Sequence, residues 1–117
     1  MPVLDAKKKA FFCALYRGGE RLCPDMDSGP AEIAAIIAAQ PKGQTLLIGS
    51  GAAMLHEQLA AIDPQLDIIA GTGLRWGNAE TLLSMAQKNG ITECNTDFAA
   101  GPHYIRKSDA EIELGKR

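Results

Sequence analysis

Two closely spaced glycines at a predicted strand-to-helix turn, Gly49-Ser50-Gly51, have the clearest potential for chemistry in this sequence. Glycines at such a turn let the backbone amides at a helix N-terminus approach an anion, so the turn is a candidate phosphate contact. The signal is weak, because Met54 stands where a dinucleotide-binding turn has its third glycine. Gly49, Ser50 and Gly51 are therefore interpreted as a weak, degenerate nucleotide-binding turn.

Ser50 does not fit the pattern of a catalytic nucleophile. A nucleophile elbow has glycines two residues before and two residues after the serine, whereas here the glycines are its immediate neighbours. A serine just before a helix more often caps the helix N-terminus through its hydroxyl oxygen. We predict that Ser50 is an N-cap.

The acidic residues and histidines form no catalytic or metal-binding pattern. Asp5 ends the first predicted strand, where a ribonuclease H-type nuclease carries one of its metal-binding acids. Glu32 and Glu80 each lie in the first turn of a predicted helix, where a carboxylate commonly complements the helix dipole. His56 and His103 have no partner at ligand spacing. The sequence thus predicts no catalytic residue, no metal site and no cofactor.

A basic run, Lys7-Lys8-Lys9, occupies a predicted turn between two strands. Three charges support only weak, salt-sensitive contact with RNA, and such runs are usually solvated loops. The net charge of −2 also argues against a strongly basic nucleic-acid surface. Direct contact of this turn with RNA is left open.

These positions are joined by a regular succession of strands and helices. The expected strands cover residues 3–5, 11–16, 22–23, 45–48 and 66–70. A helix is expected to begin at Ser28-Gly29-Pro30, a second after Gly51, and a third capped by Asn78. The apolar, buried face of the third helix is expected to comprise Ala79, Leu82, Leu83 and Ala86.

The resulting order, β-β-β-α-β-α-β-α, predicts an α/β fold. Three antiparallel strands followed by strand–helix units indicate a mixed five-stranded sheet with helices packed on it. This layout is that of the ribonuclease H-like fold, which is also the repeated half of the actin-like ATPases. Residues 1–117 are expected to form a single domain of this kind.

Composition places the chain among ordinary globular proteins, with 46% apolar and 22% charged residues. No apolar run approaches the ~20 residues of a membrane helix, and the first residues do not resemble a signal peptide. Cys13, Cys23 and Cys94 have no CxxC spacing and are interpreted as reduced thiols packed as small apolar groups. A cytoplasmic location is predicted.

Three segments, taken together, resemble one known family. Residues 3–12 are similar to its "DAR/K…G-E-V-Y" strand-turn-strand, and residues 101–111 to its closing "P-x-Y-x-R-x-x-x-A". Between them, residues 47–52 are similar to its "G-x-G-A" turn. The family is that of the TsaB (YeaZ) proteins, also described as glycoprotease-like or peptidase family M22. They take part in making threonylcarbamoyladenosine in tRNA.

The resemblance implies a non-catalytic scaffolding subunit. It covers the second half of such proteins, whose first half opens with a strand leading to Asp-Thr-Ser and is expected to be absent here. In the family that first half carries most of the contact with a TsaD-type catalytic partner, so tRNA would be reached indirectly. A homodimer is left open, no membrane contact is expected, and no nucleophile or zinc motif supports the protease label.

The residues that match family positions are Asp5, Pro102, Tyr104 and Arg106, and the resemblance implies structural roles for them. Asp5 would end the first strand, Tyr104 would bury its ring, and Arg106 would pair with Asp5 or Glu111. Two alternatives are kept: a nucleotide-binding fragment of an actin-like ATPase and, less favoured, a ribonuclease H-like metal nuclease.

Overall fold

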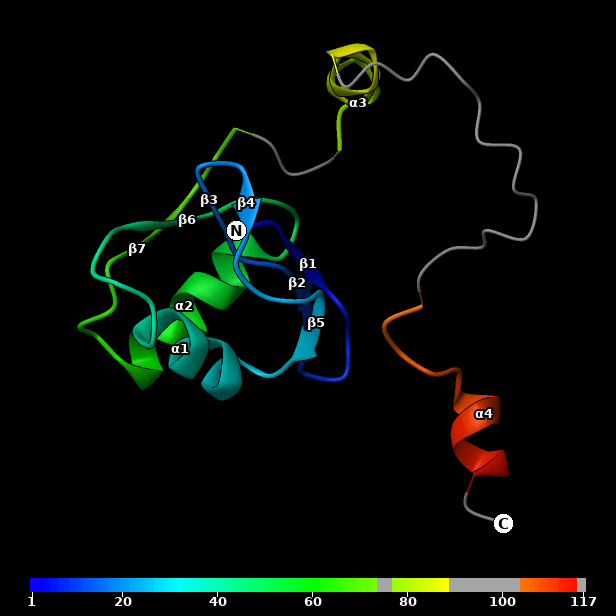
Figure 1. Ribbon diagram of the computed structural model, residues 1–117. Helices are drawn as coiled ribbons and strands as arrows, with labels where there is room; N and C mark the ends of the chain where they lie inside the picture. Colours follow the sequence, from blue (N-terminus) through cyan, green and yellow to red (C-terminus); the bar gives the residue numbers. More distant parts are fainter. Residues whose placement is uncertain (74–76, 89–103, 116–117) are drawn as a thin grey trace. The chain divides into compact units, whose positions relative to one another are not determined.

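The computed structural model describes residues 1–73, 77–88 and 104–115, and the chain divides into two units, Met1–Trp76 and Gly77–Arg117 (Figure 1). The strands are β1 (Val3–Asp5), β2 (Phe11–Cys13), β3 (Tyr16–Arg17), β4 (Glu20–Arg21), β5 (Met26–Ser28), β6 (Thr45–Leu47) and β7 (Ile68–Ala70). The helices are α1 (Pro30–Ala38), α2 (Ala52–Ile62), α3 (Ala79–Lys88) and α4 (Asp109–Leu114). The predicted α/β class is confirmed.

The strands form several short sheets rather than one. Strands β1, β2 and β5 make an antiparallel sheet in the order β1-β2-β5, β3 and β4 form a hairpin, and β6 pairs with β7 in parallel. Between β1 and β6 the described residues show only a parallel bridge from Pro2 to Ile48, with Val3 N donating to the Ile48 carbonyl at 2.7 Å. In the described residues the predicted single five-stranded sheet is not present, because an isolated bridge outside the named strands is all that pairs the β1-β2-β5 sheet with the β6–β7 pair.

The third strand lies further along the chain than predicted. Residues 22–23 are not a strand; they follow the β3–β4 hairpin, whose turn uses Gly18 and Gly19 at positive φ. Strand β5 begins after Pro24, which has no N–H to donate to a ladder. Ser28 closes β5 and is buried, so Gly29 takes the N-cap of α1, with Pro30 at the first helical position as expected.

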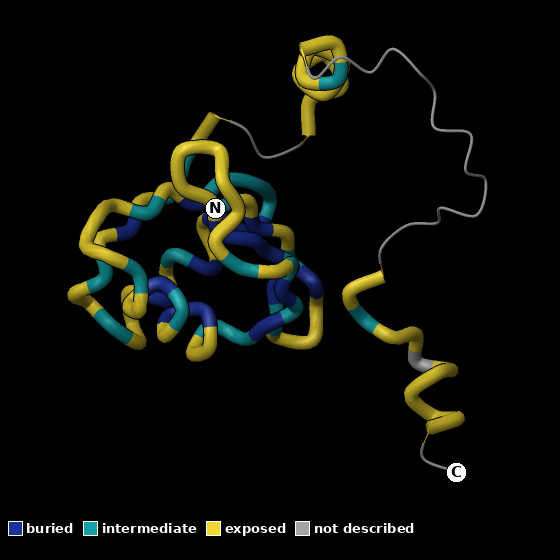
Figure 2. The backbone as a smooth tube through the Cα atoms, in the orientation of Figure 1, coloured by how far each residue is buried: buried dark blue, intermediate teal, exposed yellow. Residues whose placement is uncertain are grey.

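The core of the first unit lies between one face of the strands and the helices α1 and α2. Strands β2 and β5 bury alternate residues, as the two-residue period of a strand requires, and β1, β6 and β7 contribute Val3, Leu47 and Ile68. Figure 2 shows the buried stretches gathered in these elements. The helices contribute Ile33, Ala34, Ile37, Ala52, Leu55 and Leu59. These buried residues are spaced so that they share one face of each helix.

The opposite face of the strands is also apolar but is not covered in the described residues. Leu46 pairs in register with Ile69, and Leu4 with Phe12. Leu4, Leu46 and Ile69 are all exposed, with Leu4 at 51%. Alternation therefore places these residues on the second face of their strands.

In the second unit, α3 begins where the sequence predicts, but its apolar face is exposed. The Asn78 side chain accepts hydrogen bonds from the amides of Glu80 (2.9 Å) and Thr81 (3.3 Å), so the predicted cap is confirmed. No residue of α3 is buried, and Leu82 is 69% exposed, so the predicted burial is wrong. The spacing of apolar residues fixes which of them share a face, but not whether another element covers it.

Helix lengths in the described part of the chain are modest. Helix α2 has 11 residues and α1 has nine, about half of what a transmembrane helix needs. None of the described helices combines the length and apolar character needed to cross a bilayer.

Candidate functional site

The predicted nucleotide turn lies between β6 and α2 and packs directly on the backbone of β1. Gly49 has a φ of 111°, in the left-handed region, and a Cβ added there would overlap the Val3 carbonyl oxygen. A Cβ added at Gly51 would lie 2.9 Å from the Asp5 backbone nitrogen. Close approach of the turn to β1 is therefore sufficient to explain both glycines.

The amides that would receive a phosphate at this turn already have acceptors. Gly51 N donates to the Val3 carbonyl at 3.1 Å, and Ala52 N donates to the Gly49 carbonyl at 3.2 Å. A phosphate at the helix start would have to replace these bonds, because each amide has a single proton. Nucleotide binding by Gly49, Ser50 and Gly51 stays a prediction, and these two amides do not favour it.

Ser50 does not cap α2. The N-cap residue is Gly51, and no side-chain hydrogen bond closes this helix end. The bond from Gly51 N to Val3 fixes Gly51 in a helical conformation, and its carbonyl accepts from Leu55 N at 2.9 Å. The helix begins after Gly51 as predicted, but Ser50 lies in the preceding turn and is not its cap.

Asp5 is committed to the turn that follows β1. Its Oδ1 accepts from the Lys7 amide at 2.8 Å, and its Oδ2 pairs with the Lys7 ammonium at 2.7 Å. The hydrogen bond from the Lys7 side chain, together with that from its amide, holds the pKa of the Asp5 carboxyl below its ordinary value. Asp5 thus ends β1 at the meander turn, as the resemblance implies, and acts there as a clamp.

The basic turn itself has an unusual backbone. Lys7, Lys8 and Lys9 have φ values of 60°, 52° and 62°, in the left-handed region that residues other than glycine rarely adopt. The turn is closed by Ala10 N donating to the Lys7 carbonyl and by Ala6 N donating to the Ala10 carbonyl, both at 3.0 Å. All three lysines are exposed, so their side chains meet no crowding that would exclude this conformation.

A cavity of about 470 Å³ lies beside this turn. It is lined by residues of the β1–β2 hairpin, by Pro30, and by Met54 and Gln58 of α2. Its charged lining residues are Asp5, whose carboxylate is bonded to Lys7, and Lys9. The cavity therefore offers one ammonium group beside an apolar wall, and no pair of groups suited to acid–base catalysis.

No metal site is formed by the described residues. They contain no cluster of three or more His, Cys, Asp or Glu side chains placed to hold an ion. His56 is partly buried on α2, and His103 lies outside the described residues. For a two-metal nuclease, Asp5 would need acidic neighbours, and the described part of the chain supplies none in a metal-binding cluster.

The cysteines that the structure describes behave as packing residues. Cys13 is buried in the core, and that burial, with a smaller contribution from Cys23, raises the pKa of its thiol to about 11. Cys23 is partly buried, and its Sγ accepts from Leu15 N at 3.4 Å. A thiol with this pKa is protonated at neutral pH, which fits the predicted packing role for Cys13. Cys94 lies outside the described residues.

The family-like tail is only partly described. Pro102 lies outside the described residues, and Tyr104 is 80% exposed, so the expected burial of its ring is wrong. Glu111 accepts from Ser108 N at 2.7 Å, while Ser108 Oγ accepts from Glu111 N at 3.3 Å. These bonds form a capping box that starts α4, a helix the sequence analysis did not predict although the S-x-x-E pattern signals it. Arg106 is partly buried.

Arg17 and Lys42 were not predicted as site residues. The Arg17 guanidinium donates to the Pro41 carbonyl at 3.2 Å, 24 positions away. The two cations line a second cavity, of about 330 Å³. No local pattern marks them, because they come together only through the fold.

Comparison with known proteins finds no matching family model, no matching curated protein and no matching solved structure.

Proposed function

We propose that the chain is the C-terminal domain of a TsaB-family protein and acts as a non-catalytic scaffolding subunit in threonylcarbamoyl transfer to adenosine in tRNA. Strand arrangement is the observation that carries this proposal. Strand β2 is antiparallel to β1 and β5, while the Pro2–Ile48 bridge and the β6–β7 pair are parallel. An antiparallel group of strands followed by a parallel pair, with helices between them, supports the ribonuclease H-like layout that the resemblance implies, although the strands form separate short sheets.

Two of the three segments that resemble the family lie against each other in the first unit. Residues 3–12 form β1, the lysine turn and the start of β2. The glycine turn, which lies further along the chain between β6 and α2, packs on the backbone of β1. Two distant family-like segments therefore support each other's geometry. Residues 101–111 add the sequence resemblance of the tail.

A scaffolding role fits the chemistry of the described residues better than catalysis does. The Asp5 carboxylate is held by Lys7, and the Gly51 amide is bonded to Val3, so neither is poised to act on a substrate. Catalysis would then belong to a TsaD-type partner, bound through the first half of the family's two-domain architecture. The tRNA would be reached indirectly.

The experiment is to measure threonylcarbamoyladenosine in tRNA, by mass spectrometry of nucleosides, from cells depleted of the full-length product of this gene. We expect the modified nucleoside to fall and to return when the intact gene is supplied. A copy carrying Gly49→Ala should restore less of it than a copy carrying Gly19→Ala, because Gly49 packs on β1 whereas nothing lies within 4 Å of a Cβ added at Gly19. An unchanged nucleoside level, in cells without a second copy of the gene, would overturn the proposal.

The ATPase alternative makes a different prediction. A nucleotide-binding fragment should give the intact protein measurable ATP affinity in the absence of any partner, whereas a scaffolding subunit should give none. Isothermal titration of the full-length protein with ATP and Mg²⁺ separates the two. Saturable binding lost on Gly51→Ala would favour the ATPase reading.

A further inference from the structure

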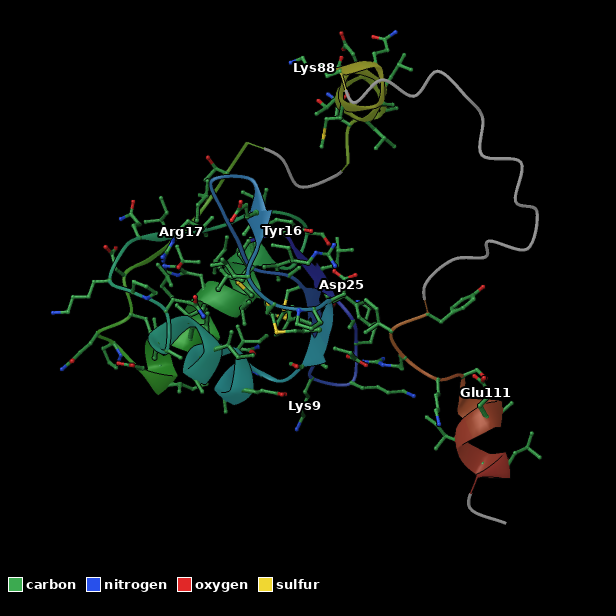
Figure 3. All side chains as sticks on the ribbon, in the orientation of Figure 1. Lys9, Tyr16, Arg17, Asp25, Lys88 and Glu111 are labelled. Atoms are coloured by element: carbon green, nitrogen blue, oxygen red, sulfur yellow. The ribbon has the colours of Figure 1, made fainter. Side chains whose placement is uncertain are left out.

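The cavity of about 330 Å³ lies between the β3–β4 hairpin and the loop that joins α1 to β6. The hairpin contributes Tyr16 and Arg17, both labelled in Figure 3, and the loop contributes Gln40, Lys42 and Gln44. Leu15, Ile37 and Leu46 are among the apolar residues that line it. The volume is at the lower end of the range for small-molecule sites, about 300–1,000 Å³.

The charges around this cavity are of one sign. Arg17 and Lys42 are the charged side chains among its lining residues, which include no carboxylate in the described part of the chain. Two acids lie next to lining residues. Glu20 is the cross-strand partner of Arg17, and Asp67 accepts a hydrogen bond from Gln44 Nε2 at 2.9 Å. Neither lines the cavity. An anion there would meet two cationic side chains and no carboxylate among the described lining residues.

The fold holds one of these cations in place and leaves the other unengaged. The Arg17 guanidinium donates one bond to the Pro41 carbonyl, which leaves further N–H groups of its five for a ligand. Among the described residues Lys42 has no ion pair or hydrogen bond from its side chain. By contrast, the hairpin's other arginine, Arg21, is paired with Asp25 at 2.9 Å and donates to the Tyr16 hydroxyl at 2.8 Å.

We propose that this cavity binds a small phosphate ester. Arg17 would hold two phosphate oxygens through its planar guanidinium, and Lys42 would add a second positive charge. The Gln40 and Gln44 carboxamides can bond hydroxyl groups of the ester, and the apolar wall formed by Leu15 and Leu46 can cover its organic part. This inference goes beyond the proposed scaffolding role and does not depend on it.

The test is a titration of the full 117-residue chain with inorganic phosphate and with phenyl phosphate at constant ionic strength, followed by amide and side-chain NMR shifts. We expect saturable shifts at Arg17, Gln40, Lys42 and Gln44, and tighter binding of phenyl phosphate than of inorganic phosphate. Lys42→Gln should weaken phenyl phosphate binding about tenfold, the loss expected for one charge-assisted contact. Lys9→Gln, a change to an exposed lysine outside this cavity, should leave the affinity unchanged.

Arg17→Gln should also weaken binding, but it removes the bond to Pro41, so Lys42→Gln is the decisive variant. Equal affinity of wild type and Lys42→Gln, or shifts centred on residues 7–9, would overturn the proposal. A single-stranded oligoribonucleotide without terminal phosphates serves as the second arm. If it displaces phenyl phosphate at a lower concentration of phosphate groups than inorganic phosphate does, the ligand is an RNA phosphodiester and the small-ester assignment is wrong.

Discussion

Two turns on either side of β1 use the same region of backbone space with opposite residue types. In the β1–β2 turn, Lys7, Lys8 and Lys9 all have φ between 52° and 62°. In the turn between β6 and α2, the left-handed position is Gly49, with φ at 111°. The lysines are exposed, whereas the glycine turn is pressed against the Val3 and Asp5 backbone.

The difference teaches when a left-handed position requires glycine. At Gly49 the absent Cβ makes room for a neighbouring strand, so no other residue fits without moving β1. At the lysines the conformation carries only the local penalty of about 1–2 kcal/mol per residue, which the Asp5 clamp offsets in part. The glycine turn is thus a packing device, and the lysine turn is an exposed loop held by one carboxylate.

The variant Gly49→Ala tests the difference between the two turns with the largest expected effect. We expect it to lower the free energy of unfolding by about 3–5 kcal/mol, because backbone strain and overlap with Val3 add together. Gly19→Ala is the matched control, since Gly19 also has positive φ, at 89°, but nothing lies within 4 Å of its added Cβ. Urea unfolding should give about 1–2 kcal/mol for the control. Equal losses would show that close approach to β1 contributes nothing.

Gly51→Ala isolates the close approach. Its φ of −91° suits any residue, so the expected loss of about 1–3 kcal/mol comes from the close contacts of the new Cβ with Asp5 N, Leu4 C and the Val3 side chain. The urea midpoint should fall by less than for Gly49→Ala. A midpoint equal to that of the wild-type protein would contradict the packing of this turn on β1.

Lys9→Gly tests the other side of the comparison. Glycine should raise the free energy of unfolding by about 0.5–1 kcal/mol, because it relieves the left-handed strain but adds freedom to the unfolded chain. Lys9→Ala keeps the strain and should bring no such gain. Thermal unfolding measures both, and a destabilised Lys9→Gly variant would mean that the lysine turn is not strained.

The Asp5 clamp predicts a smaller, pH-dependent effect. Because the pKa of Asp5 is lowered in the folded state, its ionised form stabilises the fold above its ordinary value of 3.8, and this contribution is lost as the pH falls below it. Asp5→Asn should therefore lower the urea midpoint more at pH 7 than at pH 3, where part of the carboxylate's contribution is lost. Glu57→Gln, at an exposed acid on α2, is the control. A deficit of the same size at both pH values would mean that the carboxylate charge is not what clamps the turn.

Tyr104→Ala should have the smallest effect. A ring that is 80% exposed loses almost no burial on truncation, so the change should stay within about 0.5 kcal/mol. A loss of 2 kcal/mol or more in urea unfolding would show that the ring packs after all, as the family-like tail motif suggested.

The positions of α1, α2 and α3 were predicted well from the sequence, because apolar spacing and a capping residue are local signals. The apolar spacing in residues 30–38 and 52–62 gave the helices α1 and α2, and Asn78 gave the start of α3. The third strand was predicted at residues 22–23 because Leu22 and Cys23 are apolar. The strand that pairs with β2 is instead β5, in which Met26 lies opposite Cys13 and Ser28 lies opposite Phe11. A local pattern of apolar residues does not show which strands pair, because the partners are separated in sequence, as Phe11 is from Ser28.

The same limit applies to the candidate sites. The Gly-x-Gly pattern located a real turn, but the bond from the Gly51 amide to Val3 and the position of Ser50 before the cap depend on the packing of β1 against the turn. Arg17 and Lys42 carry no motif, because the β3–β4 hairpin and the α1–β6 loop bring them to one cavity. The sequence therefore predicted the position of the glycine turn but not its hydrogen bond to Val3. The candidate anion site at Arg17 and Lys42 could be recognised only from the tertiary structure.

The most direct test of the glycine turn as a packing device is hydrogen exchange at the Gly51 amide, measured by NMR on the intact chain with and without ATP. The amide donates to the Val3 carbonyl at 3.1 Å and Gly51 is buried, so exchange should be as slow as in the core of α2 and unaffected by the nucleotide. Fast exchange without ATP that becomes slow when ATP is added would contradict the account, because the amide would then be free to bind a phosphate.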